Sequence, residues 1–357
     1  MNYGFVIPDF RGGGAEQVLI NIANFLAMNN DVYLFVGSNS GKLQNTVSNC
    51  VKVVELSGSS SGLRNLYSLI CAVKNYRIGY LCGTLSMAFL VPLIGLFNRK
   101  LFTVSRVGNT LSSDIKNKSI IKSVLFKVYF HTLLFSDSIV CQSEFMRNDL
   151  LELLPLLSSS KVKVIKNPLN RDKLKVIDIK NKSRKYRIVS IGRLEHQKDY
   201  YTSLLVIKRL INSGFDVEFL IFGDGSLKDM LIKYVEQLQI QKYVSFFGFE
   251  PNPQNYLVNS DLLLLTSLYE GYSNVIIESL CLGVPVVATN SPGGNSEIII
   301  DGFNGFLSPV GDHLDLADKV SLILAESKIN IQAADVENIK KLHSVDAISQ
   351  QFLDLVE

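Results

Sequence analysis

The chain has 357 residues, of which 47% are hydrophobic and 19% are charged, a composition that fills hydrophobic cores and excludes an intrinsically disordered protein. This length suits two domains of ordinary size. The formal net charge is only +3 and no platform of basic and aromatic residues is recognisable, which argues against nucleic-acid binding.

The charge is divided unevenly along the chain. Residues 1–167 hold 17 Lys and Arg against 9 Asp and Glu, a net +8, whereas residues 168–357 hold 19 against 24, a net −5. A basic half beside an acidic half is compatible with a protein that associates peripherally with an anionic membrane surface. The five cysteines are scattered and odd in number, so we expect reduced thiols in a cytosolic protein.

Two segments bear on membrane association, and from the first residues we expect no secretory leader. The most apolar stretch, residues 85–97, is about 13 residues long and falls short of the ~20 needed to span a bilayer, so we expect a buried helix or an interfacial patch. Further on, Lys118, Lys122 and Lys127 recur at near-helical spacing between apolar residues. This pattern fits a basic amphipathic helix on an anionic membrane or an ordinary surface helix.

The first half of the chain alternates between strand-like and helix-like segments. Apolar residues at helical spacing over residues 15–27 predict a helix. Such alternation is typical of βαβ units that build a parallel sheet. Short apolar runs predict strands at residues 3–8, 31–36, 51–56, 102–105 and 138–141.

A second series of the same kind fills the other half. Between the two series lie Asn167, Pro168 and a polar, charged stretch, which we interpret as a linker. The sequence therefore predicts an α/β fold with two Rossmann-like domains facing a central cleft: residues 1–168, residues 169–332, and a C-terminal helix within residues 333–357 that packs back on the first domain. The second series has predicted strands at residues 187–191, 217–222, 244–247, 261–266 and 284–289, and helices at 201–213, 227–238 and 275–281.

The first candidate site is a glycine-rich turn after the first predicted strand. Gly13 and Gly14 allow backbone N–H groups to approach an anion at the start of the following helix. The pattern is not the GxGxxG fingerprint of dinucleotide-binding proteins, and no acidic residue ends the next strand, which argues against an oxidoreductase. A plain tight turn is the alternative interpretation.

Two cations follow the first strand of the second series. Arg193 and Lys198 lie five residues apart on a loop after that strand. Arg can bind a diphosphate bidentately and Lys can bind it as a point charge. His196 lies between them, and we interpret it as a loop residue rather than a base. A solvated loop with two surface cations is the alternative.

The strongest pattern contains two glutamates around a helix start. Glu270 lies in a loop after a buried strand, Ser273 is placed to cap the next helix, and Glu278 falls just over one turn into it. We expect both carboxylates to face the crevice outside the strand ends, where open α/β sheets bind ligands. A carboxylate there can accept hydrogen bonds from the hydroxyls of a sugar. Two solvated helix charges are the alternative.

Three further glycine-containing segments follow strands in this half. The loop at residues 291–297 is expected to place more backbone N–H groups beside the same crevice. Residues 301–306 are interpreted as a tight turn. Residues 223–225 are interpreted as a turn with little chemistry of its own.

Together these features resemble the GT-B glycosyltransferases of family 4 over nearly the whole chain. The resemblance implies retaining, metal-independent transfer of a hexose or N-acetylhexosamine from a nucleotide sugar, UDP-linked, with no cofactor. It implies a lipid-linked acceptor of the O-antigen or capsule type at the cytoplasmic face of the inner membrane. The segments that carry it are residues 12–16, 138–144, 164–168, 192–198, 223–225, 247–249, 270–278 and 283–288.

The resemblance also implies individual roles. Arg193 and Lys198 would neutralise the departing nucleotide, which is electrostatic catalysis without a metal. Glu270 would contact the donor sugar, and Glu278 would hold the ribose hydroxyls. The other implied substrate-binding residues are Gly13 and Gly14 near the distal phosphate and acceptor, Gly248 and Phe249 at the nucleobase, and Asn295 and Glu297 beside the sugar.

The chain departs from the family pattern on the acceptor side. Many relatives carry a histidine after the strand that corresponds to residues 102–105, whereas residues 106–110 of this chain contain none. Asn109 is the candidate to supply a hydrogen bond there. Two other functions stay open at this point: an NDP-sugar epimerase or hydrolase of the same fold, and a non-catalytic nucleotide-sugar-binding partner.

Overall fold

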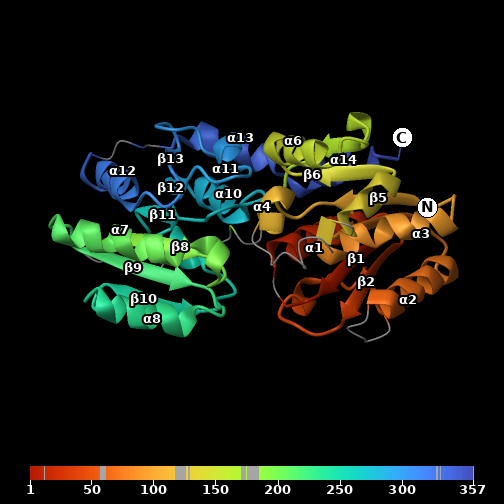
Figure 1. Cartoon of the computed structure of the whole chain (residues 1–357), viewed down its shortest axis with the longest axis horizontal. Helices are drawn as coiled ribbons and strands as arrows, with labels where there is room; N and C mark the ends of the chain where they lie inside the picture. The colour runs from red at the N-terminus through yellow and green to blue at the C-terminus, as the bar shows by residue number, and fades with distance from the viewer. Residues whose placement is uncertain are drawn as a thin grey trace. The chain divides into compact units, whose positions relative to one another are not determined.

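The chain folds into two compact α/β units (Figure 1). Unit 1 comprises Met1–Pro168 with His343–Glu357, and unit 2 comprises Leu169–Leu342. Each unit is built on a parallel sheet, as the sequence predicts. The computed structural model describes residues 1–11, 13–56, 62–116, 126–127, 129–169, 174, 185–326, 329 and 331–356.

Within the described residues, the sheet of unit 1 has seven strands, and its central strands are apolar runs buried between helices. Continuous apolar strands of this kind are typical of parallel sheets covered on both faces. The order across the sheet is β3 (Lys52–Glu55), β2 (Val32–Ser38), β1 (Asn2–Asp9), β4 (Ile78–Thr84), β5 (Phe102–Arg106), β6 (Ser138–Cys141) and β7 (Val162–Val164).

The helices of unit 1 cover this sheet through apolar stripes. On one face, Val18 and Ile22 of the first helix pack with Phe5 of β1 and with Ile348 and Phe352 near the C-terminus. The helices are α1 (Gly14–Leu26), α2 (Gly62–Asn75), α3 (Val91–Phe97), α4 (Leu111–Lys116), α6 (Glu144–Leu153) and α14 (Val345–Leu353), with short 3-10 turns η1 (Gln44–Thr46), η2 (Leu85–Phe89), η3 (His131–Phe135) and η4 (Ser159–Lys161).

The apolar stretch at residues 85–97 is mostly buried and forms η2 and α3. Leu96 and Phe97 at its end are nevertheless 54% and 73% exposed. The stretch thus has a buried part and a small exposed apolar part. Lys118 and Lys122 of the predicted basic helix lie outside the described residues. Among the described residues, no helix is both long enough and apolar enough to cross a membrane.

The sheet of unit 2 shows six strands among the described residues. Their order is β10 (Val244–Gly248), β9 (Val217–Phe222), β8 (Tyr186–Ile191), β11 (Leu262–Leu265), β12 (Val286–Thr289) and β13 (Gly305–Ser308). The last strand starts inside the segment that the sequence analysis interpreted as a turn, residues 301–306. Only the first part of that segment is a turn, because Gly305 already pairs with Val286 of β12.

The helices of unit 2 pack on both faces of this sheet. One hydrophobic cluster contains Leu204 and Val320, and the other, on the opposite face, contains Leu257 and Ile276. The helices are α7 (Tyr200–Asn212), α8 (Lys228–Gln237), α9 (Gln254–Leu257), α10 (Asn274–Cys281), α11 (Asn295–Ile298), α12 (His313–Glu326) and α13 (Ala333–Leu342), with a 3-10 turn η6 (His196–Lys198) before α7.

The expectation of a single C-terminal helix is wrong. Two helices occupy this region: α13 packs on α10 within unit 2, and α14 packs on α1 within unit 1. The break comes at Ser344, whose backbone is extended and whose hydroxyl accepts a hydrogen bond from Ala347 N at 3.4 Å, so it caps a new helix. The chain therefore returns to unit 1 at His343 rather than at residue 333.

His343 connects the C-terminal segment of unit 1 with Asn167, near the end of the N-terminal segment of the same unit. Its Nδ1 donates a hydrogen bond to the carbonyl oxygen of Asn167 at 2.9 Å, since a carbonyl can only accept. The Asn167 side chain in turn accepts a 2.6 Å hydrogen bond from Arg106 Nη2. His343 is buried, and burial lowers its pKa to about 4. The neutral imidazole is thus part of the folded structure.

We expect this histidine to make stability depend on pH. The unfolded chain binds the extra proton below about pH 6.5, and the folded chain binds it only near pH 4. The contribution of this histidine to the free energy of unfolding is therefore fully present above pH 6.5 and is lost as the pH drops toward 4. Between pH 7 and pH 5 the wild type should lose about 2 kcal/mol more than His343→Gln in urea unfolding. The exposed His131→Gln serves as control, and equal pH slopes in wild type and His343→Gln would contradict the assignment.

Candidate active site

The candidate site lies at the carboxyl ends of three neighbouring strands of unit 2, β8, β11 and β12. Because the strands are parallel, the loops that follow them emerge at one edge of the sheet. The loop after β8 carries Arg193 and Lys198, the loop after β11 carries Glu270, and the loop after β12 leads to Asn295. The sheet order thus brings together residues that are far apart in the sequence.

Hydrogen bonds join the first two loops. Leu268 N donates to the carbonyl oxygen of Gln197 at 2.8 Å, and the Gln197 side chain donates to the carbonyl oxygen of Tyr269 at 2.9 Å. This reciprocal pair uses the residue directly before Lys198 and the two residues before Glu270. The distance between the β8 loop and the β11 loop is therefore set by one backbone–backbone bond and one bond from the Gln197 side chain.

The third loop is joined to the second in the same way. Glu270 N donates to Pro292 O at 2.9 Å, and Gly294 N donates to Gly271 O at 2.8 Å. Between these two bonds lies Gly293, with φ at +134°, where an added Cβ would lie 2.1 Å from the carbonyl oxygen of Glu270. Only glycine fits this contact, because both the conformation and the space exclude a side chain.

Lys198 and Glu270 meet at this edge. Lys198 Nζ and Glu270 Oε1 are 2.5 Å apart, and their side chains are only 15% and 9% exposed. Ser267 Oγ donates to the same carboxylate oxygen at 2.6 Å. Burying two charges is costly, and the cost is offset here by their mutual attraction and by the hydroxyl donor. A cation and an acid are thus held side by side where the sequence analysis predicts ligand binding.

The loop that carries Arg193 is packed against the loop after β9. Leu194 is buried, its N–H donates to Asp224 O at 3.0 Å, and its carbonyl oxygen accepts from Leu227 N at 3.0 Å. Gly225 leaves room for Leu194, since an added Cβ would lie 2.4 Å from the Leu194 oxygen. Residues 223–225 therefore support the cation loop, a role that the sequence analysis missed. Arg193 itself is exposed.

Glu278 lies on α10 and is oriented by a residue that the sequence analysis did not predict. Gln254 Nε2, from the short helix α9, donates to Glu278 Oε2 at 2.6 Å. Ser273 occupies the N-cap position of α10, but its side chain makes no capping hydrogen bond. The expectation that this hydroxyl caps the helix is therefore wrong in detail, although the helix begins where expected.

The remaining predicted residues of unit 2 are placed as follows. Gly248 ends β10 with φ at +71° and its carbonyl oxygen accepts from Gly223 N at 2.7 Å. Phe249 is 43% exposed, and Glu297 on α11 is also exposed. Asn295 is fully buried, and its amide donates to Thr289 O at 3.2 Å and to Ser291 Oγ at 3.3 Å. It therefore holds the shape of its own loop.

The predicted residues of unit 1 surround the starts of two helices. Gly13 precedes α1, and an added Cβ there would lie 2.1 Å from Glu16 Oε2; Gly14 is the first residue of α1. Asn109 uses both ends of its amide locally: Oδ1 accepts from Thr110 N at 3.0 Å, and Nδ2 donates to Asp114 Oδ1 at 3.3 Å. Asn109 thus stabilises the start of α4.

Arg106 is a second residue that the sequence analysis missed. It is the last residue of β5 rather than part of a loop, and it is only 2% exposed. Its guanidinium donates to Thr84 Oγ1 at 3.1 Å and to Asn167 Oδ1 at 2.6 Å. Burial lowers the pKa of Arg106 to about 10, so the side chain stays charged near neutral pH. A buried cation therefore begins the segment 106–110, which contains no histidine.

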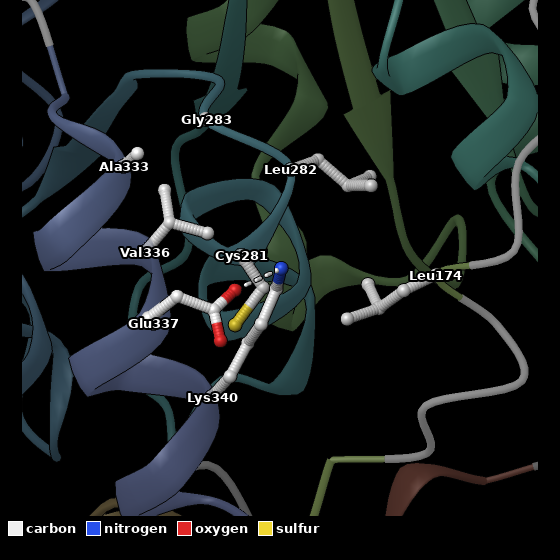
Figure 2. Close-up of a pocket in the computed structure, with 8 residues that line it drawn as sticks. All are labelled: Leu174, Cys281, Leu282, Gly283, Ala333, Val336, Glu337 and Lys340. Atoms are coloured by element: carbon white, nitrogen blue, oxygen red, sulfur yellow. Dashed lines mark hydrogen bonds and ion pairs between the residues drawn. The ribbon is translucent and has the colours of Figure 1, made fainter.

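Unit 2 also has a groove between α10 and α13, shown in Figure 2. Lys340 Nζ and Glu337 Oε1 form an ion pair of 2.8 Å. Figure 2 shows Cys281 beside this pair. Burial raises the pKa of the Cys281 thiol to about 12, so it is a poor nucleophile at neutral pH. The groove lies at the end of α10, opposite the end that follows the Glu270 loop, and we assign no chemistry to it. Among the described residues, no group of three or more potential ligands is arranged to hold a metal ion.

Comparisons with known proteins point to one family. The model of the family "Glycosyl transferases group 1" matches residues 172–341. The N-acetylgalactosamine-N,N'-diacetylbacillosaminyl-diphospho-undecaprenol 4-alpha-N-acetylgalactosaminyltransferase of Campylobacter jejuni is 26% identical over 345 residues, which are 91% of each chain. A second Campylobacter jejuni enzyme, a GalNAc-GalNAc-diNAcBac-PP-undecaprenol alpha-1,4-N-acetyl-D-galactosaminyltransferase, is 26% identical over 100% of this chain and 98% of its own.

The fold is also found among solved structures. Anabaena HepE, crystallised in complex with UDP-glucose, superposes with a TM-score of 0.84 over 100% of this chain and 99% of its own. The two sequences are 18% identical, so this likeness concerns the fold, which is that of GT-B glycosyltransferases.

A glycine substitution tests the contact between the loops after β11 and β12. Gly293→Ala should destabilise the protein by more than about 2 kcal/mol, because a strained φ is combined with a clash against the Glu270 backbone. The control is Gly302→Ala, which has φ at +77° but open space around the added Cβ, and should cost only about 1 kcal/mol. Equal losses in urea unfolding would contradict the described packing.

Proposed function

We propose that this chain, which matches the group 1 glycosyltransferase model over residues 172–341 and has the GT-B fold, is a glycosyltransferase that transfers a hexose or N-acetylhexosamine from a UDP-sugar to a lipid-linked glycan. We propose further that the transfer retains the anomeric configuration and needs no metal. The buried contact between Lys198 and Glu270, on the same edge as Arg193, carries this proposal.

The charges of this edge suit a nucleoside diphosphate leaving group. Arg193 and Lys198 are on one loop and would share the negative charge that develops on the diphosphate. Lys198 is largely buried, so its charge acts through a less polar medium than water and stabilises a neighbouring anion more strongly. Two cations on one loop would therefore supply the positive charge that a metal ion could otherwise provide.

The acids would hold the two sugars on either side of the diphosphate. We assign Glu270, in contact with Lys198, to the hydroxyls of the donor sugar, and Glu278 to those of the ribose. The nucleobase would lie against the backbone at Gly248 and Phe249. Glu297, on α11, would lie beside the donor sugar, next to the loop that Asn295 shapes.

The acceptor proposal rests on relatives and on charge. Both Campylobacter jejuni relatives are named for undecaprenol-linked acceptors. The +8 charge of residues 1–167, from 17 Lys and Arg against 9 Asp and Glu, suits attraction to an anionic membrane that holds such a lipid. We therefore propose a peripheral enzyme at the cytoplasmic face, acting in O-antigen or capsule synthesis. The turn at Gly13 and Gly14 would approach the distal phosphate and the acceptor.

A donor panel tests the reaction. The purified protein is incubated with single UDP-sugars and the lipid-linked glycans extracted from bacterial membranes, and products are identified by mass. We expect one hexose or N-acetylhexosamine to be added to a lipid-linked glycan, with UDP released in equal amount. UDP released at the same rate without any acceptor would instead indicate a hydrolase or epimerase.

Lys198→Ala tests the electrostatic role. We expect kcat to fall by roughly 10²–10³, the scale for losing one group that stabilises transition-state charge. The variant also leaves Glu270 buried without its cation, which destabilises the fold. Lys198→Ala/Glu270→Gln removes both charges and should regain stability without regaining activity. Lys233→Met, at an exposed lysine on α8, is the control, and a loss of less than about threefold in Lys198→Ala would refute the role.

Glu270→Gln should distinguish the effect of this carboxylate on diphosphate binding from its effect on sugar transfer. UDP has a diphosphate but no donor sugar, so removing the carboxylate beside Lys198 should make UDP bind roughly three- to tenfold more tightly while sugar transfer falls. Titration calorimetry with UDP measures the first effect. Glu236→Gln, an exposed residue of α8 with the same change in net charge, should leave UDP affinity unchanged. Weaker UDP binding by Glu270→Gln would overturn the assignment.

A further inference from the structure

Gln254 is buried at the point where α9 meets α10. It is the first residue of α9 and only 1% exposed. Its Nε2 donates to Glu278 Oε2 at 2.6 Å, a short bond to a charged acceptor. Hydrogen bonds to charged groups are among the stronger polar interactions in proteins. This amide is therefore able to fix the orientation of the Glu278 carboxylate.

The short helix that carries Gln254 is itself firmly anchored. Leu257 is fully buried in the core of unit 2. The ring of Tyr256 lies 4.8 Å from that of Phe222 on β9 and 5.3 Å from that of Phe247 on β10. Pro253 precedes the helix and restricts the backbone at its start. The amide thus projects from a rigid support, as an orienting group requires.

Gln254 carries an energetic cost. Its Oε1 is buried and has no hydrogen-bond partner among the described residues. An unsatisfied buried acceptor typically costs about 1–3 kcal/mol, which an apolar side chain of similar size would avoid. The fold alone would therefore favour an apolar residue here. What the amide provides in return is its bond to Glu278.

We propose that Gln254 is a positioning residue, which fixes the Glu278 carboxylate so that it accepts hydrogen bonds from the ribose of the nucleotide. This inference rests on the proposed role of Glu278. A glutamate side chain has several rotatable bonds, and holding it in place before the ligand arrives reduces the entropy lost on binding. Gln254 also connects the loop after β10, which would meet the nucleobase, with the acid that meets the ribose.

The proposed orientation of Glu278 by Gln254 predicts selectivity for ribose over deoxyribose. A site built to accept a hydrogen bond from a hydroxyl discriminates against the analogue that lacks it. With Glu278 fixed, wild type should bind UDP more tightly than 2′-deoxy-UDP. Once Glu278 is released, the carboxylate is no longer aligned with the hydroxyls, and the two affinities should approach each other.

The test is titration calorimetry with UDP and 2′-deoxy-UDP. Gln254→Met removes the donor and keeps an unbranched side chain of similar length. We expect about tenfold weaker UDP binding, little change for 2′-deoxy-UDP, a raised KM for the donor with kcat within about threefold, and unchanged or greater thermal stability. Asn259→Ala is the control, because Asn259 bonds to Asn255 O at 3.1 Å on the same segment and should not change the ratio of the two affinities.

A double-mutant cycle with Glu278→Ala separates the possible failures. Gln254→Met should add no further loss to Glu278→Ala if the amide acts through the carboxylate. UDP affinity unchanged by Glu278→Ala would refute the role of Glu278 and hence the proposed nucleotide site. A loss in Glu278→Ala together with wild-type behaviour of Gln254→Met would refute the positioning role alone.

Two further outcomes are decisive. Equal losses for both nucleotides, additive with Glu278→Ala, would mean that Gln254 contacts the nucleotide or only supports the fold, and would overturn the proposal. If Gln254→Met does not fold, Gln254→Glu gives an independent test with the same side-chain size. It places two carboxylates together, so UDP should bind at least as weakly as expected for Gln254→Met. Wild-type affinity in Gln254→Glu would refute the positioning role.

Discussion

The ion pair between Lys198 and Glu270 is the interaction around which the proposed site is organised. Both side chains are largely buried, so each charge depends on the other and on the Ser267 hydroxyl for compensation. A diphosphate bound at Lys198 would change this balance, because its negative charge would repel the Glu270 carboxylate and compete for the same cation. Glu270 would then gain by accepting hydrogen bonds from neutral donors such as the hydroxyls of a sugar. In the proposed site, this one pair of residues would therefore couple nucleotide binding to sugar binding.

This coupling requires that the loops that carry Lys198 and Glu270 stay rigid when the ligand binds. Backbone hydrogen bonds connect the loops after β8, β11 and β12, and Gly293 removes the side chain that would separate two of them. Groups that are already oriented need little rearrangement when charge develops, which is why such rigidity serves electrostatic catalysis. The sheet order of unit 2 therefore determines the chemistry, because it decides which loops become neighbours.

Much of this could be predicted from the sequence. Alternating apolar segments predicted two parallel sheets, and the positions of Arg193, Lys198, Glu270 and Glu278 after strands placed them at one edge of unit 2. The local hydrogen bonds that polar side chains make with nearby backbone groups were harder to predict. Helical spacing continues past Ser344, yet its hydroxyl starts a new helix, and the amide of Asn109 is used by its own helix start. Sequence spacing shows that a polar group is present but not which partner it takes.

Long-range polar contacts were beyond prediction for a related reason. Arg106 bonds to Asn167, 61 residues away, and a cation at a strand end is more often solvated than buried. Its burial is possible because Thr84, at the end of β4, and Asn167, in the segment after β7, supply acceptors that only the sheet order brings together. A guanidinium stays protonated near neutral pH and therefore cannot act as a general base. Unit 1 thus holds a buried positive charge at the end of β5, where it bonds to both Thr84 and Asn167.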